Sequence, residues 1–128
     1  MLNLQKKLIL TIERLVNIYG KWHKRLQVMG LIMHGGDAKG KAVEAIRAAK
    51  AGRFEEAKTL IGEANTALNT AHISQTALLT QEVSGDSVEL SLLLIHGQDH
   101  LMTALTFIDV AKEIIELHEK IDRLTEDE

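Results

Sequence analysis

Residues Leu92 to Thr103 read L-L-L-I-H-G-Q-D-H-L-M-T. This stretch places His96, Asp99 and His100 at positions i, i+3 and i+4, a spacing that puts their side chains on one side of a helix. The surrounding run from Leu90 to Met102 is almost entirely apolar, so a helix formed here needs another protein surface to cover it. The stretch therefore predicts a mostly buried helix that carries a small polar patch.

Three explanations of this patch are open from spacing alone. The residues can be hydrogen-bonded polar groups at a helix interface, because buried polar groups are usually satisfied without performing chemistry. They can hold a metal ion, because imidazole and carboxylate groups one turn apart can share one ion. Alternatively, one histidine is a nucleophile, and Asp99 and the second histidine set its tautomer and orientation.

Two further segments accompany the patch. They are M-G-L-I-M-H-G-G-D-A-K, from Met29 to Lys39, and A-H-I-S-Q-T, from Ala71 to Thr76. Together with I-H-G-Q-D-H-L-M-T they resemble, in order and spacing, the lactose/cellobiose family of enzyme IIA proteins of the bacterial phosphotransferase system. The residues around H-G-G-D-A-K look closer to its cellobiose/chitobiose branch. The resemblance covers about residues 28–124.

The resemblance implies roles for five residues. The family's phosphorylated histidine corresponds to His96, and its second, supporting histidine corresponds to His100. Its metal-binding aspartate corresponds to Asp99, which implies a divalent cation, Mg²⁺, shared between subunits of a homotrimer. His72 and Gln75 are expected to line the phosphorylation pocket. The implied phosphoryl donor is phospho-HPr and the acceptor is a cysteine of the IIB component, in the uptake of a β-linked disaccharide of the cellobiose/chitobiose or lactose type.

The composition describes one domain with a hydrophobic core. The chain has 128 residues, of which 45% are hydrophobic and only 3% aromatic, so Leu, Ile and Ala must fill the core. It has no Cys, which excludes disulfides and thiolate chemistry within the chain. No apolar run reaches the ~20 residues of a membrane span, and no G-x-x-x-x-G-K-[ST] loop indicates direct use of ATP. We expect a cytoplasmic protein that meets the membrane only through the sugar permease.

Residues 1–27 differ from the rest of the chain. They hold six Lys or Arg and one Glu, a formal charge of +5, whereas residues 28–128 hold nine Lys or Arg and seventeen Asp or Glu, a charge of −8. Since they do not match the family, we predict an amphipathic helical extension over 1–27, either specific to a lineage or introduced by engineering, and a three-helix phosphocarrier domain over 28–128. Nucleic-acid binding is not expected, because no aromatic stacking platform accompanies the cations.

The apolar residues of this extension recur with gaps of four and three, as in a helix that packs against another helix. We call them the N-terminal seam: Leu8, Ile12, Leu15, Tyr19, Trp22, Leu26 and Met29. One helix over residues 3–51 would be about 70 Å long and would carry the seam beyond the bundle. The regular spacing favours a straight helix that pairs with other copies of the chain. The alternatives are a helix on a membrane surface and a fourth helix folded back at Gly20.

Apolar periodicity predicts three long helices in the chain. The first continues from the extension and stops at Gly52, and the second covers residues 54–81 with His72 and Gln75 as a polar notch in its apolar face. Without the resemblance, His72 is best explained as a satisfied interface histidine. The third helix is expected to start directly after the polar break at residues 84–87, with Asp86 and Glu89 as a capping box, and to reach Leu124.

These helices predict an all-α, antiparallel three-helix bundle with a heptad-patterned N-terminal extension. Glycines in the first helix, at positions 30, 35, 36 and 40, are expected to allow close approach of another helix. The third helix is too apolar for three helices to cover, which predicts a homo-oligomer, and the resemblance implies a homotrimer. Three Asp99 carboxylates would then meet near its axis and require a cation or a proton.

Two rival functions remain beside the phosphocarrier. A metal hydrolase would use His96, Asp99 and His100 on one ion, but the chain shows no evident general base or further ligand set for it. A helical assembly module, engineered or natural, would use the same cluster only as an interface or metal site. Phosphorylation by enzyme I, HPr and phosphoenolpyruvate would distinguish these functions, because only the carrier gains an acid-labile phosphoryl group.

Overall fold

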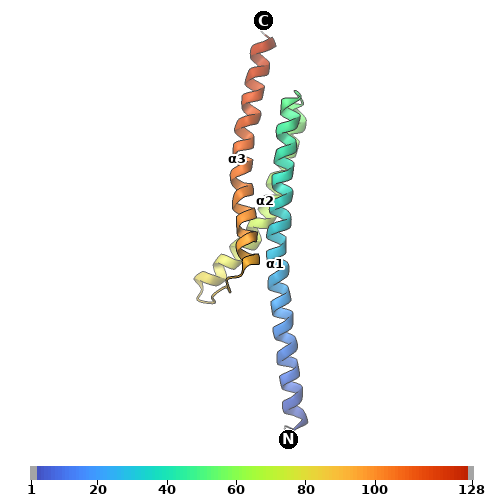
Figure 1. Cartoon of the computed structure of the whole chain (residues 1–128), viewed down its shortest axis with the longest axis vertical. Coiled ribbons are helices and arrows are strands. Elements are labelled where there is room, and N and C mark those ends of the chain that lie inside the picture. Colours follow the sequence, from blue (N-terminus) through green and yellow to red (C-terminus); the bar gives the residue numbers. More distant parts are fainter. Residues whose placement is uncertain (1–2, 127–128) are drawn as a thin grey trace.

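The computed structural model describes residues 3–126 and confirms the three-helix prediction. It consists of α1 (Leu4–Lys50), α2 (Phe54–Val83) and α3 (Leu92–Glu126), and no strand occurs in this described part of the chain. Each helix runs antiparallel to the one before it, and α1 packs against both α2 and α3 (Figure 1). None of the helices within residues 3–126 has the length and apolar character needed to cross a membrane.

Helix α1 is one continuous element of 47 residues. Its first amides are capped by the Asn3 side chain, whose Oδ1 accepts hydrogen bonds from the N–H groups of Gln5 and Lys6 at 2.8 and 3.2 Å. Its end follows the sequence prediction, since Gly52 has a φ of 77°, a conformation that favours glycine. The helix does not bend back at Gly20, and its N-terminal part projects as a single straight rod past α2 and α3 (Figure 1).

The predicted start of the third helix is wrong. The connection after α2 continues to Ser91, and no capping box forms at Asp86 and Glu89. The Glu82 carboxylate instead accepts a hydrogen bond from the Val88 N–H at 2.6 Å, which holds the segment out of a helix. The Ser91 Oγ accepts the Leu94 N–H at 3.1 Å and caps α3, so a serine inside the apolar run begins the helix.

The core is built from small and aliphatic residues, so the helices approach closely. A Cβ on Gly35 of α1 would lie 3.1 Å from the His100 carbonyl carbon, and one on Gly97 of α3 would lie 3.2 Å from Val28 Cγ1. These contacts press the first half of α3 against α1. The prediction that glycines of α1 allow close approach of another helix is wrong for positions 30, 36 and 40, where a Cβ would meet nothing within 4 Å among the described residues.

This difference between neighbouring glycines gives a stability prediction. Gly35→Leu must push apart two backbones, so we expect it to lower the free energy of unfolding by about 1–3 kcal/mol. Gly36→Leu is the matched control, because it adds the same side chain in open space, and it should leave stability equal or raise it by up to ~1 kcal/mol. Urea denaturation followed by circular dichroism measures both variants. Equal stability of the two variants would contradict the close contact between α1 and α3.

Candidate phosphorylation site

The first half of α3 presents two histidines side by side. His96 is exposed and His100 is half-buried, and their Nε2 atoms lie 3.1 Å apart with the ring centroids separated by 4.5 Å. The ring planes make an angle of 80°, which suits a hydrogen bond along the edge of each ring. One Nε2 must therefore carry the proton while the other accepts it. This hydrogen bond engages the lone pair of the accepting nitrogen, which becomes available when the two rings separate.

Asp99 lies beside this pair on the outer face of α3. Its side chain is exposed and makes no hydrogen bond or ion pair within residues 3–126. Exposed apolar side chains lie within about 40° of it around the helix, at ~100° per residue. We call them the α3 stripe: Leu92, Ile95, Val110, Leu117, Ile121 and Leu124. Across the described residues, no three His, Asp or Glu side chains of one chain are grouped to hold a metal ion.

A second group of hydrogen-bonded polar side chains joins α2 to α3. Gln75 is 8% exposed, and its Nε2 donates a hydrogen bond to Gln98 Oε1 at 2.6 Å. Its Oε1 then accepts from His72 Nδ1 at 3.1 Å, which places the proton of His72 on Nδ1. Gln98 is absent from the residues predicted as site members, although it lies inside the motif that contains His96.

The two polar groups lie on different flanks of α3. At ~100° per residue, Gln98 is about 160° around the helix from both His96 and His100. Within one chain, the structure brings the two histidines of α3 together and separately brings together His72, Gln75 and Gln98. It does not join the two sets. Sequence could not show this division, because it depends on which flank of α3 contacts α2.

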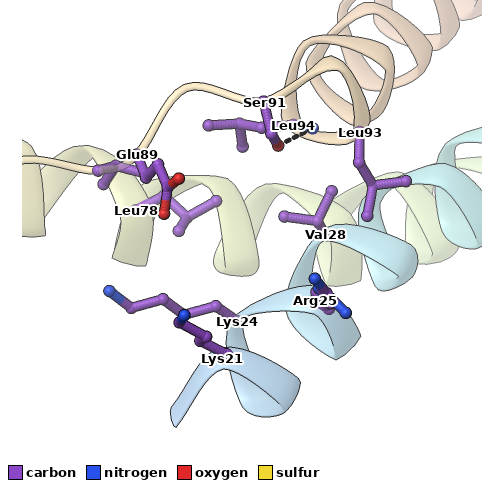
Figure 2. A pocket seen from close by; sticks show the side chains of 10 residues that line it. Lys21, Lys24, Arg25, Val28, Leu78, Glu89, Ser91, Leu93 and Leu94 are labelled. Carbon is purple, nitrogen blue, oxygen red and sulfur yellow. Dashed lines mark hydrogen bonds between the residues drawn. The ribbon is translucent and has the colours of Figure 1, made fainter. Parts of the chain in front are cut away.

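A cavity of about 220 Å³ lies elsewhere, at the point where the projecting part of α1 leaves the bundle (Figure 2). It is lined by Lys21, Lys24 and Arg25 of α1, by Glu89 of the α2–α3 connection, and by apolar residues of all three helices. None of the predicted site residues lines it. The candidate phosphorylation site is therefore an open surface of α3.

Residues 26–119 match the family described as the lactose/cellobiose-specific IIA subunit of the phosphotransferase system. The chain is 48% identical over 94 residues to the lichenan-specific phosphotransferase enzyme IIA component of Bacillus subtilis, covering 73% of this chain and 86% of that protein. It is 43% identical over 94 residues to the N,N'-diacetylchitobiose-specific EIIA component of Escherichia coli, covering 73% and 81%.

Solved structures show the same similarity. The cellobiose-specific enzyme IIA from Bacillus anthracis aligns with a TM-score of 0.75 and 41% identity, covering 77% of this chain and 90% of that one. A solution structure of the chitobiose IIA–HPr complex from Escherichia coli aligns with a TM-score of 0.68 and 39% identity, covering 77% and 96%.

Proposed function

Because the chain belongs to the lactose/cellobiose-specific IIA family of the phosphotransferase system, we propose that it accepts a phosphoryl group on His96 and passes it on. The donor is phospho-HPr and the acceptor is a cysteine of a IIB component. The single observation that carries this assignment is the exposed His96, whose Nε2 lies 3.1 Å from His100 Nε2. A relative solved in complex with HPr supports the choice of donor.

The chemistry requires a neutral imidazole on His96. The lone pair of His96 Nε2 attacks the phosphorus of the donor phosphohistidine, the new N–P bond forms as the donor N–P bond breaks, and the donor nitrogen keeps that electron pair. The Nε2–H of His100 gives up its hydrogen bond to His96 Nε2 as the phosphorus approaches, which frees the His96 lone pair, and donates instead to a phosphoryl oxygen. Transfer to the IIB cysteine repeats the step with the thiolate as nucleophile. Catalysis rests mainly on positioning and charge neutralisation.

The α3 stripe supports assembly as a homotrimer. It is an exposed apolar face that no helix within residues 3–126 covers, and Asp99 lies on its midline between Ile95 and Val110. If three α3 helices met at one axis, three unpaired carboxylates would converge there and repel one another. Carboxylate oxygens are ligands of hard cations, so the three Asp99 side chains fit a shared Mg²⁺ ion. That ion would neutralise their charge and hold the subunits together.

Such a trimer would also give His72 and Gln75 a place near the phosphorylated histidine. Around a threefold axis, one flank of each α3 faces the opposite flank of the next copy. The His96 flank of one subunit would therefore face the Gln98 flank of its neighbour, where Gln75 bridges His72 to α3. The neighbouring subunit then supplies the rest of the pocket lining.

Location and substrate follow from this role. We propose a cytoplasmic protein of the uptake system for a β-linked disaccharide, because its relatives are named for lichenan, cellobiose, lactose and N,N'-diacetylchitobiose. The sugar itself would be bound by the membrane subunit. The choice among these sugars therefore rests with that subunit.

His100→Ala should slow phosphoryl transfer by about 10- to 100-fold, because a hydrogen bond to a charged group contributes ~1.5–3 kcal/mol. The variant should keep its helical structure, since His100 packs on α1 through its backbone. His118→Ala, on the same helix, is the control and should transfer at the unmodified rate. Quench-flow measurement with phospho-HPr gives the rates. An unchanged rate for His100→Ala would remove its supporting role.

The proposed function is tested with enzyme I, HPr and phosphoenolpyruvate, followed by intact mass measurement of this chain. We expect the addition of one acid-labile phosphoryl group per chain, and its loss when the IIB component is added. If no group is added while HPr itself becomes phosphorylated, the phosphocarrier proposal fails. The alternative of a helical assembly module would then replace it.

A further inference from the structure

The N-terminal seam has no partner among residues 3–126 of its own chain. All seven of its members are exposed, from Leu8 to Met29, and the structure extends it by one more position to Met33, which is 66% exposed. Trp22, the only tryptophan of the protein, is 59% exposed. An apolar face of this length does not stay in water without a covering surface.

The seam faces away from the bundle. Where α1 enters the bundle, Val28 and Leu31 are buried against the other helices, whereas Met29 and Met33 remain exposed. At ~100° per residue, the seam lies on the side of α1 opposite the buried side. The bundle therefore does not obstruct a flat surface that approaches the seam, and the N-terminal part of α1 projects past the other two helices (Figure 1).

The cations of the extension lie on the other side of the helix. Figure 2 shows Lys21, Lys24 and Arg25 on the side of α1 that faces α2 and the connection carrying Glu89. At ~100° per residue, Lys7 and Arg14 lie within about 40° of Ile18 around the helix, so they stand at the edge of the apolar side. Among residues 3–27, Leu10 is the one large apolar residue on the cationic side. The extension is thus a basic amphipathic helix with nearly complete segregation of its two faces.

A second copy of the chain fits this surface poorly. Self-pairing would bring one charge of +5 against another, and no acidic side chain stands at the positions that flank the seam in the heptad pattern: Ile9, Thr11, Val16, Ile18, His23 and Arg25. The seam and the α3 stripe also lie on opposite sides of the bundle. In a trimer assembled through α3, the seams would point away from one another and could not pair within it.

We propose that the extension binds the surface of an anionic lipid membrane. The helix lies in the plane of the surface with the aliphatic members of the seam against the acyl chains and with Tyr19 and Trp22 at the level of the headgroups. Lys7 and Arg14, which flank the apolar side, reach the lipid phosphates, whereas Lys21 and Lys24 on the opposite side of the helix face away from the lipid. The α3 helix then faces away from the lipid, so His96 stays open to protein partners. If the proposed function holds, this attachment raises the concentration of the carrier near its membrane permease. Lipid binding itself is measured without any phosphotransferase protein.

Fluorescence of Trp22 in the full-length chain tests the proposal directly. Vesicles of phosphatidylglycerol mixed with phosphatidylcholine should shift its emission to shorter wavelength, and pure phosphatidylcholine vesicles should do so much less at equal lipid concentration. The shift should weaken at high salt, because screening reduces the attraction to surface charge. Equal shifts with both lipids, or none with either, would overturn the proposal.

Three variants identify the surface, and their partitioning is measured by co-sedimentation with vesicles. Leu15→Glu should lower binding to anionic vesicles at least tenfold, because it places a charge in the centre of the seam. Lys7→Gln with Arg14→Gln should lower it about twenty-five-fold at low salt, since each cation near an anionic surface contributes about a fivefold gain. Ile73→Glu is the control, as Ile73 is 72% exposed on α2, and binding should not change.

Sedimentation without lipid tests the alternative that the seam binds another copy of the chain. If the mass of the assembly falls on Leu15→Glu but not on Ile73→Glu, and anionic vesicles do not bind the unmodified chain, the seam pairs copies of the chain and the lipid proposal is wrong. If Leu15→Glu leaves the mass unchanged and abolishes vesicle binding, the seam is a lipid-binding face. Phosphorylation by HPr should be the same in all these variants, so a failure of either proposal is recognised separately.

Discussion

His96→Gln should abolish phosphorylation of the chain by phospho-HPr, with a loss of at least about a thousandfold in rate. Glutamine keeps a polar side chain of similar length at an exposed position but offers no nucleophilic nitrogen. The helix should be unaffected, because the close contact of α3 with α1 is made by the neighbouring Gly97. Intact mass after incubation with enzyme I, HPr and phosphoenolpyruvate measures the result.

His118→Gln is the matched control for this variant. His118 lies on the same helix, half-buried and far along the chain from the motif, so its replacement should leave the label at one phosphoryl group per chain. Full labelling of His96→Gln would contradict the assignment of His96. Complete loss of the phosphoryl label in His118→Gln would show that the assay responds to structural disruption of α3 and not to His96 specifically.

The second large effect concerns Asp99 and the metal dependence of assembly. We expect the unmodified chain to sediment as a trimer in Mg²⁺ and to dissociate after exhaustive dialysis against a chelator. Three carboxylates without a cation repel one another by about 4 kcal/mol for each pair at ~4 Å and an effective dielectric constant of ~20. Asp99→Leu should remain a trimer under both conditions, because it replaces these charges with apolar contact in the middle of the α3 stripe.

Asp109→Leu is the control for the loss of a carboxylate on α3. Asp109 is exposed, forms an ion pair with Lys112 at 3.4 Å and lies off the centre of the stripe, so its replacement should leave the metal requirement unchanged. A metal-indifferent monomer for the unmodified chain would contradict both the trimer and the shared ion. A metal-indifferent trimer would contradict the ion alone.

Much of the fold could be predicted from local sequence. The spacing of Leu31, Ala38 and Ala42 gives the buried face of α1, and all three are fully buried. The stop at Gly52 follows from the backbone freedom of glycine, and its positive φ confirms it. These predictions succeed because helical periodicity and end signals depend on neighbouring residues.

Other features depend on contacts between distant residues and could not be predicted. The start of α3 is set by Ser91, which caps the helix, and by Glu82, which accepts a hydrogen bond from the Val88 N–H six residues away. The capping signal at Asp86 therefore does not start a helix. Of the four glycines expected to admit another helix, only Gly35 does so, because contact depends on the side of α1 that faces α3.

The candidate site was predicted in the same uneven way. His96 and His100 are one turn apart on one helix, so their contact follows from spacing, and the structure places their Nε2 atoms 3.1 Å apart. The bond between Gln75 and Gln98 joins two helices and is visible only once α2 and α3 are packed together. The direction in which the N-terminal seam faces also depends on the packing of the helices. The sequence predicted that the seam pairs with other copies of the chain, and the fold shows that it faces away from the bundle.

The location of the phosphoryl group within the chain tests the central claim most directly. The chain is phosphorylated through enzyme I and HPr, digested at alkaline pH to preserve phosphohistidine, and the peptides are sequenced by mass spectrometry. We predict one modified residue, His96, with the remaining five histidines unmodified. A phosphoryl group on His72, His100 or any other residue, with His96 unmodified, would contradict the assignment.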